Sequence, residues 1–334
     1  MNFLLTSAAK TFSLTAIAKM SDEQVEELLK GLRWPETEGR PVCPECGCDA
    51  VYVLKTRSQY RCKRCGHTFS LTSGTLFHSS KLSLRTILQI GLLWANAAKG
   101  KSALEIRRDI GLNHKSSFVI LHKLREALFK NRDVTPMTGS VEADGMHVGG
   151  AIRHANLAVD RPEQNTKPTP RLCVIALCQR NPAHGGALRT LVRVVETERA
   201  AAIIDFVGEH VVQGATVYAD EHAGYDRLAA WFDLRRVNHK RGYRGDGGEN
   251  INLCENLFSR FRRLQFGQIH KVEPRYLEVY ANEIAYRIDT CRWDNKRITS
   301  DILGKALRTG RSESWRGYWR AKAGPDVGPL QAAA

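Results

Sequence analysis

The chain has 334 residues, of which 43% are hydrophobic and 25% charged, as expected for a globular protein of roughly two or three domains. It contains no run of about 18 or more apolar residues, so we expect no transmembrane helix and no membrane partner. Its formal net charge of +15 favours a polyanionic partner, and because Lys and Arg are scattered through sequence of globular pattern, nucleic acid is expected.

The first 40 residues are expected to form a helical leader. The opening stretch MNFLLTSAAKTFSLTAIAKM is mildly apolar, but it has no basic n-region and is interrupted by Lys10, which is not the pattern of a secretory signal. Nine cysteines in such a chain favour reduced thiols and metal binding over a disulfide framework. We therefore expect a cytoplasmic protein.

Residues 41–80 carry the pattern of a zinc ribbon. The expected ligands form two C-x-x-C pairs, Cys43 with Cys46 and Cys62 with Cys65. Each pair can present two thiolates to one ion, and two pairs complete the tetrahedral shell of a structural Zn²⁺ site. The intervening run alternates as a short hairpin does, and Gly47 and Gly66 suit the tight turn after each pair. Cys48 and His67 are close enough in sequence to replace one ligand.

Residues 81–135 are predicted to be helical. A capping box and a following glycine predict a helix over 103–110, and a further helix begins near residue 113. Helix, short turn and helix is the order of a helix-turn-helix motif, whose second helix would present Lys115 and Ser116 to a major groove. An ordinary helical linker domain fits the same pattern, but the net charge and the adjoining ribbon favour DNA contact.

Residues 136–300 change to a strand-rich pattern. Strands are predicted at 140–150, 171–180, 187–196 and 214–220, and a helix at 198–211. Three antiparallel strands followed by a helix that crosses to a parallel fourth strand place the centre of the first strand beside the end of the fourth. Asp144 and Asp220 are therefore expected to be neighbours.

These acids point to a divalent cation. Two neighbouring carboxylates raise each other's pKa and cost stability unless a cation compensates them. Carboxylates can hold one or two Mg²⁺ or Mn²⁺ ions, roughly 3.5 to 4 Å apart when two bind, which activate a hydroxyl nucleophile at a phosphodiester. Glu255 heads the amphipathic run CENLFSRFRR, whose apolar stripe would pack on the sheet, so it is the candidate third ligand. The alternative is an ordinary first-turn acid favoured by the helix dipole.

The motifs VEADGMHVGG, VYADEHAGYDRL and NLCENLFSRFRR, preceded by the zinc ribbon, resemble the transposases of the IS1595 group. The resemblance runs from about residue 20 to about residue 300. It implies an α+β multidomain protein with a zinc ribbon, a helical segment and an ISXO2-like catalytic domain of RNase H-like fold with a mixed sheet. Matched residue by residue, the family's catalytic acids fall on Asp144, Asp220 and Glu255, which would bind Mg²⁺.

The same resemblance implies a transposase that cuts the ends of an insertion sequence and joins them to target DNA. Its partners would be double-stranded DNA, as element ends and as target, and further copies of the chain on the paired ends, in association with the bacterial nucleoid. The basic residue two helical turns after the glutamate falls on Arg262, where it could hold a terminal phosphate, and Arg263 beside it would also contact DNA. Residues 301–334 would be a basic tail, whose aromatics either stack on bases or anchor it.

The sequence departs from the family pattern at Gly145, where a second acid usually follows the aspartate. Asn256 is an alternative third ligand, and Asp246 and Glu249 are competing acids in a Gly-rich loop. His222 and His239 either contact DNA or are ordinary surface or capping histidines. Two other functions fit the same fold: a DNA-binding regulator without catalysis, and a nuclease or junction resolvase.

Overall fold

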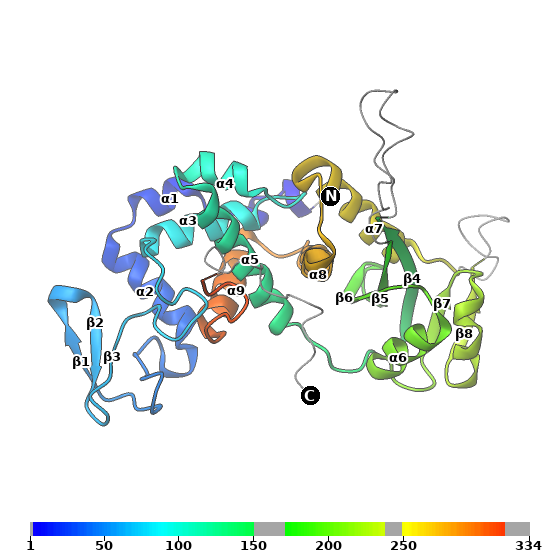
Figure 1. The fold of residues 1–334 in the computed structure, drawn as a ribbon, viewed down its shortest axis with the longest axis horizontal. Coiled ribbons are helices and arrows are strands. Elements are labelled where there is room, and N and C mark those ends of the chain that lie inside the picture. The colour runs from blue at the N-terminus through cyan, green and yellow to red at the C-terminus, as the bar shows by residue number, and fades with distance from the viewer. Residues whose placement is uncertain (1–2, 150–170, 238–248, 318–334) are drawn as a thin grey trace, which may run out of the picture. The chain divides into compact units, whose positions relative to one another are not determined.

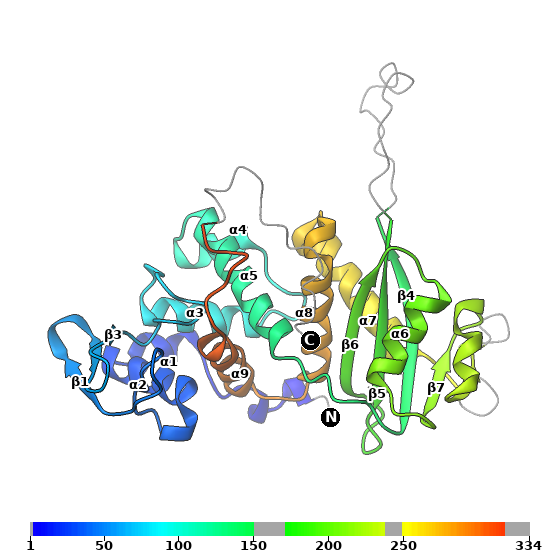
Figure 2. The same cartoon turned by 60° about the horizontal axis from the view of Figure 1, so that its bottom comes forward.

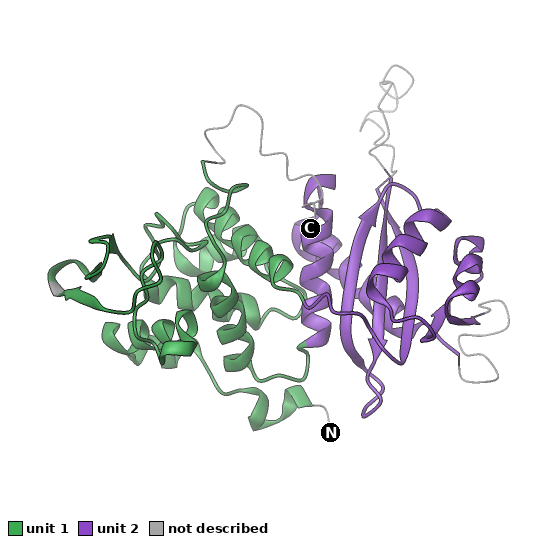
Figure 3. Cartoon of the chain, turned by 90° about the horizontal axis from the view of Figure 1, so that it is seen from below, with its two compact units in different colours: residues 1–132, 290–326 green, residues 133–289, 327–334 purple. Residues whose placement is uncertain are grey.

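The computed structural model describes residues 3–149, 171–237 and 249–317, and the chain divides into two compact units (Figure 1, Figure 3). Unit 1 holds the described residues up to 132 and from 290 onward, and unit 2 holds those from 133 to 289. The sequence suggestions for His239 and Asp246 lie outside the described residues. Among the described residues, no helix has the length and apolar character needed to cross a membrane.

Unit 1 combines a small three-stranded sheet with a group of helices. Its elements are α1 (Leu14–Lys19), α2 (Asp22–Arg33), β1 (Val51–Leu54), β2 (Gln59–Cys62), β3 (Thr68–Phe69), α3 (Leu84–Ala95), α4 (Ala103–Ile110), α5 (His114–Lys130) and α9 (Asn295–Arg308). The predicted helix over 103–110 is confirmed: Ser102 and Glu105 make both capping-box hydrogen bonds, and Gly111 ends the helix at φ 76°. The next helix starts at His114, as expected.

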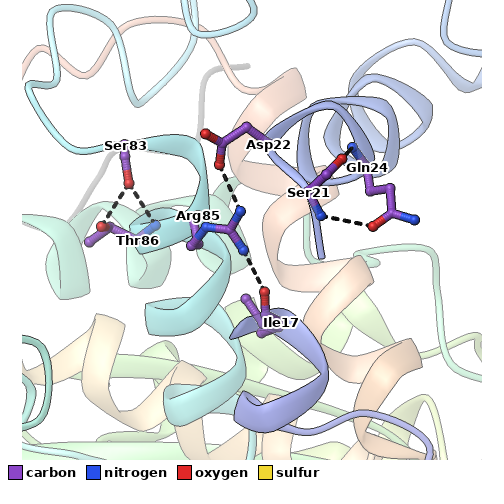
Figure 4. A network of polar contacts seen from close by, with 7 residues as sticks. All are labelled: Ile17, Ser21, Asp22, Gln24, Ser83, Arg85 and Thr86. Atoms are coloured by element: carbon purple, nitrogen blue, oxygen red, sulfur yellow. Dashed lines mark hydrogen bonds and ion pairs between the residues drawn. The ribbon is translucent and has the colours of Figure 1, made fainter. Parts of the chain in front are cut away.

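A polar network ties the first helices together (Figure 4). Ser21 and Gln24 form a capping box that starts α2, and the Ser83 hydroxyl accepts the Thr86 N–H at the start of α3. Arg85, on α3, donates to the Ile17 carbonyl at the end of α1 at 2.5 Å and to the Asp22 carboxylate at 2.7 Å. One guanidinium thus satisfies groups on two other helices.

Helix α9 returns to unit 1 from the C-terminal part of the chain. It contacts α2, α3 and α5, and a side chain at Gly91 of α3 would meet Leu303 at 2.9 Å, so the two helices approach closely because α3 carries a glycine there. Beyond α9, Trp315 stacks on His122 of α5 with ring centroids 4.5 Å apart. This aromatic therefore anchors the end of the described chain within the core.

Histidine 122 is expected to make unit 1 sensitive to acid. Burial, and then the charge of Arg125, hold the pKa of His122 well below 6.5. The folded state therefore binds its proton more weakly than the unfolded state, so stability is fully present above pH 6.5 and falls as the pH drops, by up to about 1.4 kcal/mol per pH unit. The free energy of unfolding of His122→Gln, measured by urea denaturation between pH 7 and 5, should change less with pH than that of the wild type. His114→Gln, a control at an exposed position, should follow the wild type.

Unit 2 is built on a five-stranded mixed sheet. Its elements are β4 (Ser140–Val148), β5 (Leu172–Arg180), β6 (Ala187–Val195), α6 (Ala200–His210), β7 (Thr216–Ala219), the 3₁₀ segment η6 (Ala223–Ala230), β8 (Asp233–Arg236), α7 (Asn252–Leu264) and α8 (Leu277–Asp289). The strand order is β6-β5-β4-β7-β8. Strands β4, β5 and β6 are antiparallel, and β7 runs parallel to β4, so the predicted topology is confirmed.

Helices cover the two faces of this sheet (Figure 2). On one face, α6 buries Ile203 and Phe206 against the β4 and β5 side chains, including Val141 and Ile175. On the other face lie α7, which contacts β4 and β5, and α8, which contacts β6. The sheet is therefore covered by helices on both faces.

Candidate metal centres

The two C-x-x-C turns of unit 1 face each other across the ribbon. The hairpin of β1 and β2 is antiparallel, with Val51 opposite Cys62. In each knuckle a glycine N–H donates to the carbonyl of the first cysteine, Gly47 to Cys43 and Gly66 to Cys62, with φ of 70° and 73°. Positive φ at both places is the reason that glycine follows each pair.

The four thiols have the spacing of a tetrahedral zinc site. The sulfur atoms of Cys43 and Cys65 are 3.6 Å apart, as are those of Cys46 and Cys62, and the four lie within 4.8 Å of one another. Four sulfurs at the usual Zn–S bond length stand about 3.8 Å apart, so the cluster fits structural Zn²⁺. Cys48 instead points its sulfur at the Ala50 carbonyl, and His67 stacks on Phe69.

Arginine 33 fastens this ribbon to α2. The residue is 8% exposed, and its guanidinium lies over the Trp34 ring and donates to the carbonyls of Ser70, Leu71 and Ser73. Burial lowers the Arg33 pKa to about 10, but the group stays charged at neutral pH. The loop after β3 is thereby held by three carbonyl contacts to one side chain.

Zinc removal is expected to unfold the ribbon. The core there is small, comprising Trp34, Tyr60 and Phe69 beside two of the cysteines, so the ion supplies much of the folding free energy. Cys62→Ser should therefore contain one zinc fewer per chain and melt at a lower temperature, measured by metal analysis and calorimetry. Cys48→Ser, the control outside the cluster, should keep the wild-type zinc content; the same loss in both variants would contradict the assignment.

The parallel pairing of β4 with β7 brings two predicted acids together. Ala143 is opposite Ala219, so Asp144 and Asp220 occupy the next position of each strand. The Asp144 side chain accepts the Gly145 N–H at 2.8 Å, and that of Asp220 accepts the His222 N–H at 3.0 Å. The His222 ring in turn accepts the Gly224 N–H at the start of η6, which is the capping role.

Asp144 lies in a strongly negative environment. Its pKa is raised to about 8, mainly by burial and further by the charges of Asp220, Glu198 and Glu255, against the lowering effect of the Gly145 N–H. The acids at positions 220 and 255 are thus within electrostatic reach of Asp144, as the strand order and the following helix predicted. The ligand atoms of these three acids do not all lie within 4.8 Å of one another, in contrast to those of the ribbon.

The start of α7, which carries Glu255 in its first turn, is fixed by Glu142. This glutamate is 1% exposed and accepts the Leu253 N–H at 2.7 Å with one oxygen and Arg180 Nε at 2.8 Å with the other. Arg180 also donates to the Asn250 carbonyl at 2.6 Å. The N-cap residue Ile251 makes no side-chain cap, and the carboxylate of Glu142 on β4 accepts the Leu253 N–H instead.

Glu198 is the acid that sequence reasoning missed. It precedes α6, and its carboxylate lies where a side chain at Gly145 would be, with an oxygen 2.3 Å from the ideal Cβ position. The Tyr225 hydroxyl donates to it at 2.8 Å. The signal in the sequence was Gly145, which stands where the family usually has a second acid. Because glycine has no side chain, it leaves space there for the carboxylate of Glu198.

The remaining predicted residues of α7 face solvent. Arg262 and Arg263 are exposed, with Arg263 donating to the Ser259 carbonyl, and the exposed Asn256 accepts from Arg260. The pKa of Arg235 on β8 is raised mainly by its hydrogen bond to Asp233, and the competing acid Glu249 adds a smaller contribution.

Lys115 and Ser116 line a groove within unit 1. Its volume is about 490 Å³, and its lining also includes Lys81 and Lys123. Nearby, the pKa of His78 is lowered by burial and then by Arg311, Lys123 and Arg316. The start of α5 therefore opens onto a basic surface.

Comparisons with known proteins match both parts of the chain. Residues 20–68 match the family model of the transposase zinc-ribbon domain, and residues 136–289 match that of the ISXO2-like transposase domain. The chain is also 23% identical over 302 residues to a protein of Halobacterium salinarum described as "Uncharacterized protein in transposable element ISH50". That similarity spans 86% of this chain and 98% of the relative.

Proposed function

Since the chain belongs to the IS1595 family of transposases, as its resemblance predicted, we propose that it binds the terminal repeats of an insertion sequence, cleaves there and joins the ends to target DNA. The observation that carries the proposal is the placement of Asp144 beside Asp220 by the parallel pairing of β4 with β7, within electrostatic reach of Glu198 and Glu255, in a protein of net charge +15. Such a group calls for a divalent cation.

The proposed fold of unit 2 is RNase H-like. Support comes from the order of its elements, namely three antiparallel strands, a crossover helix and a fourth strand parallel to the first. The proposed domain plan is a helical leader, the ribbon, a helix-turn-helix-like segment and a catalytic domain from about 136. The sequence boundary at 300 is moved to 289, because α9 and Trp315 pack within unit 1 and so belong neither to the catalytic domain nor to a tail.

In this proposal Asp144, Asp220 and Glu255 hold Mg²⁺ or Mn²⁺, for which carboxylate oxygens are the preferred donors. The bound ion would activate the attacking hydroxyl group and stabilise the leaving oxygen of the phosphodiester. Glu142 positions the first turn of α7, and the exposed Arg262, seven residues after Glu255, contacts a DNA phosphate.

The basic groove of unit 1 is the proposed contact for double-stranded DNA. Lys81 and Lys115 are exposed on its rim, as phosphate-binding side chains must be. Paired element ends would be held by at least two copies of the chain. The double variant Lys81→Ala/Lys115→Ala should bind DNA about tenfold more weakly. The slope of its log affinity against log salt concentration, measured by titration at several salt concentrations, should be shallower by the amount that about two phosphate contacts contribute. Lys19→Ala, an exposed control of the same unit, should bind as the wild type does.

The decisive experiment is an end-cleavage and strand-transfer assay with the purified chain, Mg²⁺ and DNA carrying the terminal repeats that flank the gene. Cleavage at the repeat ends, with joining to a second DNA, is expected. Binding without cleavage would favour the non-catalytic regulator. Cleavage that ignores the repeats and selects branched DNA would favour a nuclease or resolvase.

A further inference from the structure

A second set of possible metal ligands lies on the α6 face of the sheet in unit 2. His147 of β4 is directly opposite Cys173 of β5, so their side chains share one face of the antiparallel pair. Glu198 reaches them from the loop before α6, and its carboxylate is 3.8 Å from His147 Nε2. One ligand atom from each of the three lies within 4.8 Å of the other two.

This arrangement is built into the fold. Glu198 is seated in the space over Gly145 and held by the buried Tyr225 hydroxyl at 2.8 Å, so its carboxylate has a fixed place. Cys173 is fully buried, whereas the His147 side chain is 38% exposed. An ion would therefore reach the cluster from the His147 side and keep a coordination position open there.

The negative charge at this cluster also favours the binding of a cation. The Glu198 side chain is 10% exposed and lies within electrostatic reach of Asp144. Within the described parts of the chain, its one ion pair is with His147, which compensates it only when protonated. A buried acid so placed is stabilised by a bound divalent ion.

We propose that His147, Cys173 and Glu198 bind a thiophilic divalent transition-metal ion, with Zn²⁺ the best fit. One thiolate, one imidazole and one carboxylate are a donor set that zinc accepts and that Mg²⁺, which prefers oxygen ligands alone, does not. The site is separate from the ribbon zinc. It also differs from the proposed Asp144 centre, because side chains alternate along β4 and Asp144 belongs to the opposite face from His147.

Zinc content tests the site without any DNA assay, so the result stands whether or not the chain cuts DNA. The purified full-length chain, saturated with Zn²⁺ and then dialysed, is expected to hold two zinc ions per chain, and His147→Ala one. His147 is partly exposed, so its loss should not prevent folding. Cys173→Ser should also hold one, whereas Cys178→Ser, a buried cysteine of the same strand, should hold two.

Cobalt supplies a second measurement. Co²⁺ replacing zinc should give thiolate charge-transfer absorption from both sites, and His147→Ala should lose the part due to Cys173 and bind the second equivalent at least about tenfold more weakly. A single zinc in the wild type, or two in His147→Ala, would overturn the proposal. Cys173 and Glu198 would then share a hydrogen bond and no metal ion.

Discussion

Asp144→Asn is expected to lose Mg²⁺-dependent DNA cleavage while making the protein more stable in the absence of Mg²⁺. The substitution removes one proposed ligand and with it several kcal/mol of charge stabilisation, so cleavage should fall by about a thousandfold or more. Mg²⁺ should raise the melting temperature of the wild type and leave that of the variant unchanged, because ligand binding stabilises only a folded state that binds it.

The gain in stability has a defined pH window. The Asp144 pKa is about 8 in the folded chain against 3.8 for an ordinary aspartate, so the folded state binds its proton more tightly than the unfolded state does. Its contribution to stability is therefore fully present below pH 3.8 and is lost as the pH rises to about 8. Asparagine carries no charge, so the variant should exceed the wild type by about 2 kcal/mol near pH 8 to 9, without Mg²⁺.

Denaturant unfolding at a series of pH values, with zinc retained and Mg²⁺ omitted, measures this difference. Asp205→Asn serves as the control, because Asp205 is an exposed acid on α6 of the same unit. It should cleave and unfold as the wild type does. Full cleavage by Asp144→Asn would remove the proposed role of this residue, and equal stability at pH 9 would show that the raised pKa does not hold in solution.

The sequence predicted those parts of the structure that depend on local patterns. Alternation and turn residues located the strand that carries Asp144 and the strand that ends next to Asp220. The order of three strands, a helix and a fourth strand was then sufficient to predict that the first and fourth strands pair in parallel. The ribbon followed from the spacing of four cysteines, whose ligation geometry leaves few alternatives.

Contacts between residues far apart in the sequence were not predictable in this way. Glu198 was predicted to begin the helix over 198–211, but α6 starts at Ala200 and Glu198 lies in the loop before it, with its carboxylate in the space that Gly145 leaves. The packing of α9 on α3 depends in the same way on a glycine, Gly91, which a helical pattern does not distinguish from alanine. In both cases the contact was missed because a glycine, by lacking a side chain, leaves the space in which another segment packs.

Glu142→Ala is expected to lower the stability of unit 2 by about 3 to 5 kcal/mol. It leaves the partly buried Arg180 without its carboxylate partner and the Leu253 N–H in the first turn of α7 without its acceptor. Chemical denaturation should show the loss. Glu196→Ala, an exposed acid at the end of β6, should change stability by less than about 0.5 kcal/mol.

Glu142→Gln separates the contribution of Glu142 to stability from its effect on the proposed chemistry. Glutamine keeps the shape and one acceptor oxygen, so this variant should fold, but it can satisfy either Arg180 or the Leu253 N–H and not both. Because Glu255 stands two residues after Leu253, a loosened α7 start displaces it, and kcat should fall while DNA affinity is unchanged. Wild-type kcat in a stably folded Glu142→Gln would mean that packing of Cys254 against Cys178 and the Ala176 carbonyl suffices to hold α7. The buried pair of Glu142 with Arg180 would then serve stability alone.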